Sequence, residues 1–276
     1  MDPLQTLFES PNLRTRKLPA ELARLYDGDL GFDAPRLFAN FVSSIDGIVA
    51  LRSVEASPSV ISGKNEADRF VMGLLRAHAD VVVIGAGTLR SEPEHRWTPD
   101  FIYPPASDAY AALRRELHLS SQPELWVVTA GGVLDPGIPA LEGATIVTTS
   151  KGASHLRRER LASTIVDVGG GGTVEIASAI DAVRDRGHSS ILSEGGPTII
   201  GQLLLEGLLD ELFLTVSPRL LGRPLAEDRP GLVQGVDLLD GGPTRGDLMS
   251  VRKHGSHLFL RYALARARSA RESRAA

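Results

Sequence analysis

Residues 81–90 read VVVIGAGTLR, so that four β-branched residues run directly into two glycines and a threonine. A strand that is apolar throughout is typical of the centre of a sheet, where both faces are buried. The glycines allow the backbone to approach a ligand closely, and Thr88 can cap a following helical turn whose amides face a phosphate. A tight turn without a ligand is the alternative, because the segment lacks the third glycine of a dinucleotide fingerprint.

Outside this segment, short β-branched runs alternate with longer helical patterns, which predicts an α/β protein with helices covering the sheet. Strands are expected at residues 37–43, 81–84, 125–129, 144–148, 165–168, 190–192, 211–216 and 257–263. Helices are expected at residues 65–78, 107–119, 174–186 and 198–209. We interpret residues 1–33 as an N-terminal surface extension, residues 34–265 as the folded domain and residues 266–276 as a solvated tail.

The composition excludes several classes of protein. Of 276 residues, 42% are hydrophobic and 23% charged, which is sufficient for a large core. The net charge of −4 is too small to attract nucleic acid or an anionic membrane. The absence of cysteine excludes disulfides, thiolate metal sites and a cysteine nucleophile. No apolar run reaches the roughly 18 residues of a membrane span, and residues 1–30 lack a secretion signal, so we expect a cytoplasmic protein.

A second strand followed by glycines occupies residues 190–198, which read SILSEGGPT. Glu194 is expected at the carboxyl edge of the sheet, where ligands of α/β proteins bind. The two glycines and the first amides of the next helix suit a pyrophosphate, with Pro197 in the first helical turn. An ordinary turn beside a solvated Glu194 is the alternative, but two such turns in one sheet favour a nucleotide site.

A third segment of interest is residues 40–47, which read NFVSSIDG. Taken alone, its Asp-Gly pair is typical of an ordinary turn. However, Asn40, Val42 and Ser44 share one face of the predicted strand, and polar residues on a buried strand are expected where they line a polar pocket.

The sequence lacks the motifs of common hydrolases and of P-loop proteins. Gly63-Lys64 has neither the upstream glycine nor the following hydroxyl residue of a P-loop. There is no G-x-S-x-G or H-E-x-x-H motif, and the seven histidines do not pair at metal-ligand spacing. We therefore expect neither a serine hydrolase nor a metal site.

In their order along the chain, these segments resemble the RibD C-terminal family. Further matching segments are Ile61-Ser62-Gly63 leading to Arg69, RAHAD at 76–80 and LDELFLTVSPRLLG at 209–222, and the likeness runs from about residue 34 to 264. Members of this family are reductases of riboflavin biosynthesis with a dihydrofolate-reductase-like fold. The resemblance thus implies a mixed, mostly parallel central sheet flanked by helices.

The resemblance also implies the ligands and the residues that bind them. It implies NADPH as hydride donor, a homodimer, and 5-amino-6-(5-phosphoribosylamino)uracil as the substrate, whose ribose is reduced to ribityl. Carried over by position, the residues that would hold NADPH are Gly85, Gly87, Thr88, Gly195, Gly196, Pro197 and Thr198. The residues that would face the substrate or the nicotinamide are Asn40, Ser44, Asp46, Ser62, Arg69, Glu92 and Glu194.

The chain departs from the family pattern at two places. Asn40 stands where bifunctional bacterial members often have lysine. Ser91-Glu92-Pro93 stands where many members have Asp-Asp-Pro or Asp-Asn-Pro, and an unusually long segment follows up to Gln122. A zinc deaminase domain is not expected, because its Cys-x-x-Cys ligands are absent.

Reduction of an opened or imine-like ribose carbon needs a hydride, a proton and positive charge for the sugar phosphate. Glu194 or Asp46 is a candidate to relay the proton, with water as the alternative donor. Arg69 offers a planar fork for phosphate, or is a solvated helix arginine. The candidates for the 2′-phosphate that distinguishes NADPH from NADH are Thr149, Ser150 and Lys151, which follow a predicted strand. A loop lysine without this role is the alternative for Lys151.

Three classes of function remain open from the sequence. The first is the ribosylaminopyrimidine reductase. The second is a related NADPH reductase acting on another pteridine or pyrimidine, such as dihydrofolate. The third is a non-catalytic nucleotide-binding module. The shape of the pocket decides between the first two, and the fold alone does not.

Overall fold

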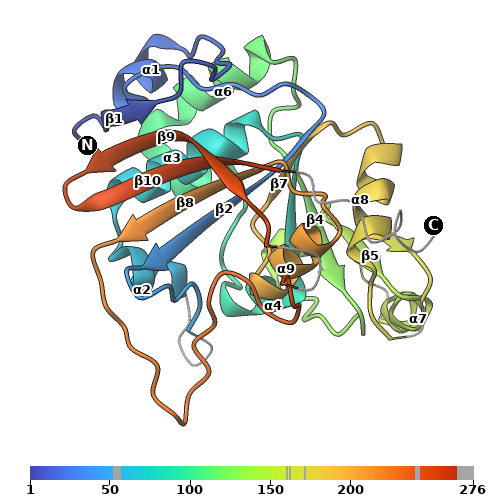
Figure 1. The fold of residues 1–276 in the computed structure, drawn as a ribbon. Helices are drawn as coiled ribbons and strands as arrows, with labels where there is room; N and C mark the ends of the chain where they lie inside the picture. Colours follow the sequence, from blue (N-terminus) through green and yellow to red (C-terminus); the bar gives the residue numbers. More distant parts are fainter. Residues whose placement is uncertain (52–56, 160, 162, 171, 240–242, 266–276) are drawn as a thin grey trace, which may run out of the picture.

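A twisted sheet forms the centre of the molecule (Figure 1). It is seen in a computed structural model, in which residues 1–51, 57–159, 161, 163–170, 172–239 and 243–265 are described. Within these residues the sheet has ten strands, in the spatial order β1-β9-β10-β8-β2-β7-β3-β4-β5-β6. The strands are β1 Gln5–Glu9, β2 Arg36–Ser44, β3 Val81–Gly85, β4 Glu124–Thr129, β5 Thr145–Thr148, β6 Thr164–Asp167, β7 Ser190–Ser193, β8 Glu211–Ser217, β9 Gly246–His254 and β10 His257–Leu264.

Strands β2 to β8 all run parallel, and β10, β9 and β1 extend one side of the sheet as antiparallel pairs. The predicted α/β class with a mixed, mostly parallel sheet is confirmed. Each of the predicted strands is present, with ends that differ by at most one residue. Because β7 lies between β2 and β3, the carboxyl ends of these three strands meet at one edge of the sheet.

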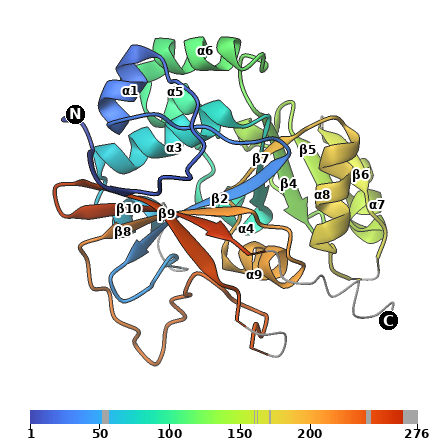
Figure 2. The same cartoon turned by 45° about the horizontal axis from the view of Figure 1, so that its top comes forward.

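Helices cover both faces of the sheet (Figures 1 and 2). The α-helices are α1 Ala20–Tyr26, α2 Ser57–Ser62, α3 Glu66–His78, α4 Ala86–Ser91, α5 Pro99–Ile102, α6 Ser107–Glu116, α7 Ser150–Arg158, α8 Ile176–Asp185 and α9 Pro197–Leu205. Short 3-10 helices span Pro104–Ala106 and Pro139–Leu141. Among the described helices, none combines the length and apolar character that crossing a membrane requires.

The alternation of side chains along the apolar strands supplies two separate cores. In β3, Val82 and Ile84 pack in the core formed with α1, α3 and α6. Val81 and Val83 point to the opposite face and pack in the core formed with α8 and α9. A strand buried on both faces must be apolar at every position, which is why residues 81–84 are a continuous β-branched run.

Helix α3 is fixed at both ends, and it carries one wall of the site described below. At its start, the Asn65 side chain accepts a hydrogen bond from the Asp68 backbone at 3.0 Å, as a helix cap does. Near its end, the buried Arg114 of α6 donates to the carbonyl oxygens of Arg76, Ala77 and Ala79 at 3.1, 3.3 and 2.8 Å. These bonds satisfy carbonyls that a helix terminus otherwise leaves free.

The expectation that residues 1–33 form a surface extension is wrong. Strand β1 pairs with β9 at the edge of the sheet, and Leu22, Leu25 and Leu30 are buried in the same core as α3. Neither β1 nor β9 was predicted, because most of their side chains are exposed or partly exposed and so lack a clear apolar alternation. The predicted tail, residues 266–276, lies outside the described residues.

Candidate active site

A cavity of about 700 Å³ lies at the carboxyl ends of β2, β3 and β7, within the range of about 300–1,000 Å³ for small-molecule sites. Its walls are formed by helices α2 and α3, by the turns after β3 and β7, and by segment 91–102, which runs from the end of α4 through α5. It brings together most of the residues predicted from the sequence. Those that line it are Asn40, Ser62, Arg69, Gly85, Gly87, Thr88, Glu92, Glu194, Gly195, Gly196, Pro197 and Thr198.

The two glycine turns lie on adjacent strands, and their four glycines have different surroundings. A Cβ atom at Gly195 would approach Ile199, including its Cβ, to 2.9 Å, so the packing of α9 requires glycine there. A Cβ atom at Gly85 would approach Cδ1 of Ile199 to 3.1 Å, a tight contact that Ile199 would have to relieve. A Cβ at Gly87 would meet nothing within 4 Å, and at Gly196 the nearest atom would be 4.0 Å away. Gly87 and Gly196 also lack a positive φ. Since the fold does not need glycine at these two positions, the open space beside them fits a ligand that touches the backbone.

The starts of α4 and α9 both face this space. Gly85 and Gly196 are the N-cap residues of these helices. As glycines they have no side chain that could accept a hydrogen bond from the first amides of the helix. Pro197 occupies the first position of α9, where its missing N–H costs no hydrogen bond. The remaining amides and the helix dipole of α9 suit an anionic group, as in many phosphate sites.

Arg76 and Glu194 form a buried ion pair in the cavity wall. Nε and Nη2 of Arg76 donate to the two carboxylate oxygens of Glu194 at 3.0 and 2.7 Å. The two side chains are only 1% and 8% exposed. Nη1 of Arg76 also donates to the carbonyl oxygens of Arg96 and Thr98, each at 3.3 Å. The pair therefore holds Glu194 in one position at the end of β7 and ties segment 91–102 to α3.

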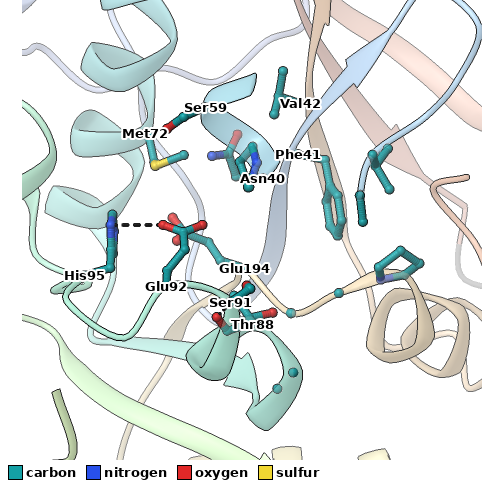
Figure 3. A pocket seen from close by; sticks show the side chains of 18 of the residues that line it. Asn40, Phe41, Val42, Ser59, Met72, Thr88, Ser91, Glu92, His95 and Glu194 are labelled. Atoms are coloured by element: carbon teal, nitrogen blue, oxygen red, sulfur yellow. Dashed lines mark hydrogen bonds and ion pairs between the residues drawn. The ribbon is translucent and has the colours of Figure 1, made fainter. Parts of the chain in front are cut away.

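His95 and Glu92 continue this network on the side of α4 (Figure 3). Nη2 of Arg76 lies 3.0 Å from Nε2 of His95, and Nδ1 of His95 lies 3.2 Å from a carboxylate oxygen of Glu92. Burial, reinforced by the positive charge of Arg76, lowers the pKa of His95 to about 3, so its ring is neutral. Burial raises the pKa of Glu92, and the charge of Glu194 adds to this effect. Four ionisable groups thus form one chain of contacts.

Asp68 is a further buried carboxyl group of the cavity. It is 5% exposed, and its side chain makes a hydrogen bond with Thr215 of β8. Burial raises the pKa of Asp68 to about 6, against the effect of the Thr215 hydrogen bond and with a contribution from the charge of Glu194. Asp68 and Arg76 lie two helical turns apart on the cavity side of α3, with Met72 between them.

The opposite end of the cavity is positively charged. Ser62 ends α2, Lys64 follows it with a left-handed φ of 57°, and Arg69 lies in the first turns of α3. All three line the cavity, as does Asn40 of β2. Two cations beside a serine hydroxyl suit a phosphate group, for which a guanidinium offers a planar fork.

Ser44 and Asp46 lie outside the cavity lining, in contrast to the prediction that they face a ligand. The Asp46 carboxylate accepts hydrogen bonds from the Ser44 hydroxyl at 2.6 Å and from the amides of Leu221 and Gly222. The Ser44 hydrogen bond is the chief cause that lowers the pKa of Asp46 to about 2. Asp46 is therefore ionised and unsuited to donate a proton, and it holds the chain that leaves β8.

Thr149 and Ser150 also lie outside the cavity lining, at the carboxyl end of β5. The Thr149 hydroxyl caps α7 by accepting from the Gly152 amide at 3.1 Å, and it donates to the Ala130 carbonyl at 2.8 Å. The Ser150 hydroxyl donates to Asp167 at 2.9 Å. Their assignment to a cofactor phosphate stays a prediction.

Comparison with known proteins identifies the family. The model of the RibD C-terminal domain matches residues 35–260. The chain belongs to the RibD C-terminal domain family. It is 25% identical over 209 residues to an Archaeoglobus fulgidus protein named 2,5-diamino-6-ribosylamino-4(3H)-pyrimidinone 5′-phosphate reductase, covering 74% of this chain and 89% of that protein.

The chain is also similar to a second named protein and to a solved structure. It is 26% identical over 227 residues to the riboflavin biosynthesis protein RibD of Mycobacterium tuberculosis, covering 82% of this chain but only 53% of that protein. The structure of a pyrimidine reductase-like protein from Corynebacterium diphtheriae superposes with a TM-score of 0.64 at 22% identity, covering 84% of this chain and 92% of that one. The latter comparison shows that the two proteins share a fold.

Arg76, His95 and Asp68 were not predicted as site residues. Arg76 and Arg69 both lie off the apolar stripe of α3, and the sequence contains nothing that shows which of the two is buried. The spacing of Asp68, Met72 and Arg76 at i, i+4 and i+8 is a signal that a second, polar face of α3 is buried. No such signal was available for His95, because it lies in an irregular segment.

Proposed function

We propose that this chain is an NADPH-dependent reductase of riboflavin biosynthesis that reduces the ribose of 5-amino-6-(5-phosphoribosylamino)uracil to ribityl. Membership of the RibD C-terminal domain family supports the proposal, as does the reductase name of the A. fulgidus relative. The observation that carries it is the meeting in one cavity of two open glycine turns, a buried Glu194–Arg76 pair and two cations.

The cofactor occupies the side of the cavity formed by the glycine turns. When bound, a nicotinamide cofactor supplies the hydride. The residues proposed to hold it are Gly85, Gly87, Thr88, Gly195, Gly196, Pro197 and Thr198. The open space at Gly87 and Gly196 supports this assignment, because a pyrophosphate bound there would contact the backbone directly.

The substrate occupies the side formed by α2, α3 and β2. Lys64 and Arg69 bind its phosphate together with the Ser62 hydroxyl, and Asn40 faces the reacting sugar. The two carboxyl groups Glu92 and Glu194 then lie near the carbon that receives the hydride. Asp68, which also lines the cavity, is adjacent to Arg69 on α3.

Three finer points belong to the same proposal. We propose that the protein prefers NADPH over NADH, through Thr149 and Ser150 at the end of β5. We also propose that it is a homodimer and acts in the cytoplasm, as the family resemblance and the composition predict.

The test follows the loss of nicotinamide absorbance with three substrates in parallel. These are 5-amino-6-(5-phosphoribosylamino)uracil, the 2,5-diamino-pyrimidinone phosphate named for the A. fulgidus relative, and dihydrofolate. Each is measured with NADPH and with NADH, and in the presence of a chelator. We expect NADPH oxidation with the uracil substrate, undiminished by the chelator.

Oxidation with the diamino compound alone would place the reduction before deamination. Oxidation with dihydrofolate alone would assign the chain to a pteridine reductase. If NADPH binds, as judged by fluorescence titration, but none of the three compounds is reduced, the proposed reductase function is wrong. Loss of activity with the chelator and its recovery with zinc would contradict a metal-free reaction.

A further inference from the structure

Two carboxyl groups face the cavity close to one another, but their surroundings differ (Figure 3). Both oxygens of Glu194 accept hydrogen bonds from the guanidinium of Arg76, which is a full positive charge. Glu92 instead contacts the ring of His95, which is neutral. Pairs of carboxyl groups in such different surroundings are typical of sites in which one of the two acts as the general acid.

The protonation of His95 can be worked out from its neighbours. A guanidinium has only hydrogen-bond donors, so Nε2 of His95 must accept the hydrogen bond from Arg76. A neutral ring then carries its single proton on Nδ1, which donates to Oε2 of Glu92 at 3.2 Å. One Glu92 oxygen is thereby occupied by a neutral donor, and its second oxygen is left to carry a proton.

The orientation of the His95 ring is fixed from several sides. The rings of Trp97 and Phe101 contact it edge-on, with centroids 4.9 and 5.1 Å away. The His95 amide donates to the Glu92 carbonyl at 3.0 Å, which closes the turn between the two residues. Because Arg76 is itself held by Glu194, the ring has little freedom to rotate. A fixed donor of this kind holds the Glu92 carboxyl group in one direction.

The charged groups around Glu92 act in opposite directions on its pKa. Burial is the main cause that raises it, Glu194 raises it further and Arg76 lowers it. His95, whose pKa is about 3, stays neutral through the range in which Glu92 titrates and cannot itself serve as the acid. A carboxyl group that holds its proton to a higher pH than usual is suited to general acid catalysis.

We propose that Glu92 is the proton donor of the reduction, and that His95, held by Arg76, is the positioning residue that directs the Glu92 carboxyl group into the cavity. This inference rests on the proposed reductase function. Glu92 follows α4, whose first turn contains the proposed cofactor residues Gly87 and Thr88, so the acid lies on the side from which the hydride arrives.

The proposed step balances with one hydride and one proton. The hydride forms a C–H bond at C1′ of the ribose, and the bond between C1′ and the ring oxygen breaks. The electron pair of that bond stays on the ring oxygen, which takes the proton from Glu92 and becomes a hydroxyl. The sugar carbon is reduced and the nicotinamide cofactor is oxidised. Glu92 is left as a carboxylate and regains a proton from solvent.

The first test compares Glu92→Gln with Glu94→Gln, in which an exposed neighbour outside the cavity lining is changed in the same way. Glutamine keeps the shape of Glu92 but has no acidic proton. We expect kcat to fall about a hundredfold or more in Glu92→Gln, with cofactor affinity and KM changed little. The wild-type rate should decline as the pH rises through the pKa of Glu92, and this decline should be missing in Glu92→Gln.

The second test addresses His95. His95→Phe removes the donor to Glu92 and should lower kcat about tenfold while shifting the pH at which the rate declines. His95→Asn places an amide N–H near the former Nδ1 and should recover most of the rate. Equal losses in the two variants, with no shift in the pH profile, would show that His95 only packs against Trp97 and Arg76.

A measurement without substrate separates this inference from the proposed function. Infrared spectra of the free protein, labelled with ¹³C at glutamate carboxyl groups, should show a protonated carboxyl band at a pH above the usual carboxyl range. We expect this band to be lost in Glu92→Gln and retained in Glu94→Gln. Its absence from the wild type, or full activity of Glu92→Gln, would overturn the inference. If the wild type is active and Glu92→Gln is equally active, the inference about Glu92 is wrong but the proposed function still holds. If the protonated carboxyl band is present but the protein reduces none of the substrates, the proposed function alone is contradicted.

Discussion

The cavity has two walls that are built in different ways. The glycine wall, residues 85–88 and 195–198, presents backbone and leaves space for a ligand. The charged wall consists of the ionisable side chains Asp68, Arg76, Glu92, His95 and Glu194. Its groups are buried or partly buried, and all except Asp68, which bonds to Thr215, depend on one another for hydrogen bonds. The open positions of the glycine wall can therefore change with little effect on the fold, whereas a change in the charged wall affects stability and chemistry together.

The largest effect is expected from Arg76→Met in the charged wall. It leaves the Glu194 carboxylate buried without its partner, which typically costs about 3–5 kcal/mol of the free energy of unfolding. Urea denaturation measures the loss, with Arg90→Met of α4 as an exposed control. The double variant Arg76→Met/Glu194→Met should regain stability but remain inactive. If the free energy of unfolding of Arg76→Met falls by less than about 1 kcal/mol, the ion pair is solvated. The charged wall would then matter no more for stability than the glycine wall.

The next largest effect concerns the glycine wall, where Gly196→Val and Gly195→Val form a matched pair. A side chain at Gly196 enters open space, so we expect an unchanged melting temperature and a loss of NADPH affinity of about a hundredfold or more. A side chain at Gly195 meets Ile199 at 2.9 Å, which should destabilise the fold by about 1–3 kcal/mol. Circular dichroism and fluorescence titration separate the two results. Unchanged NADPH affinity in folded Gly196→Val would mean that this wall is structural only.

A smaller effect is expected at the cationic end. Arg69→Ala should raise KM for the phosphorylated substrate about ten- to a hundredfold, because a charge-assisted contact to phosphate is lost. The dephosphorylated substrate should change much less, and Arg115→Ala on the exposed side of α6 should change neither. Equal losses for both substrates would indicate that Arg69 supports the structure of α3 and does not bind phosphate.

The smallest effect is expected from Asp46→Asn. The folded-state pKa of Asp46 is lowered from 3.8 to about 2, so its stabilising effect is present above the unfolded-state pKa and is lost as the pH falls through about 2. The variant should melt below the wild type at pH 7, and the difference should shrink between pH 4 and pH 2. Its kcat should be nearly normal. A large loss of kcat at unchanged stability would restore Asp46 to the catalytic role that the sequence suggested.

The strands show which structural features can be predicted from a short stretch of sequence. The buried run of residues 81–84 is apolar on both faces, and this alone distinguishes a central strand. Strands β1 and β9, which form the end of the sheet beyond β10, were missed because their side chains are mostly exposed or partly exposed. Strand β9 pairs with β10, which follows it directly in the chain, but the place of β1 depends on its pairing with β9 over a sequence separation that no local pattern records.

The same distinction separates the two walls of the site. Residues such as Gly87 and Gly196 could be predicted, because a glycine after a buried strand is a local signal and needs no knowledge of distant parts of the chain. Asp46 was predicted to face a ligand, whereas in the structure it accepts hydrogen bonds from the amides of Leu221 and Gly222. These partners are far away in sequence, so the structural role could not be predicted locally. Likewise, nothing near Arg76 shows that Glu194 will meet it.

The amino-acid sequence on its own determined the α/β class, most of the strands and the two glycine turns, since these follow from side-chain periodicity and from the conformational freedom of glycine. The family resemblance added the mixed, mostly parallel order of the sheet. Only the tertiary structure decided which ionisable groups are buried together. Burial of a charge depends on what covers it, and segment 91–102 covers Arg76 by folding back on α3. The protonation states of Glu92 and His95 are a consequence of that packing.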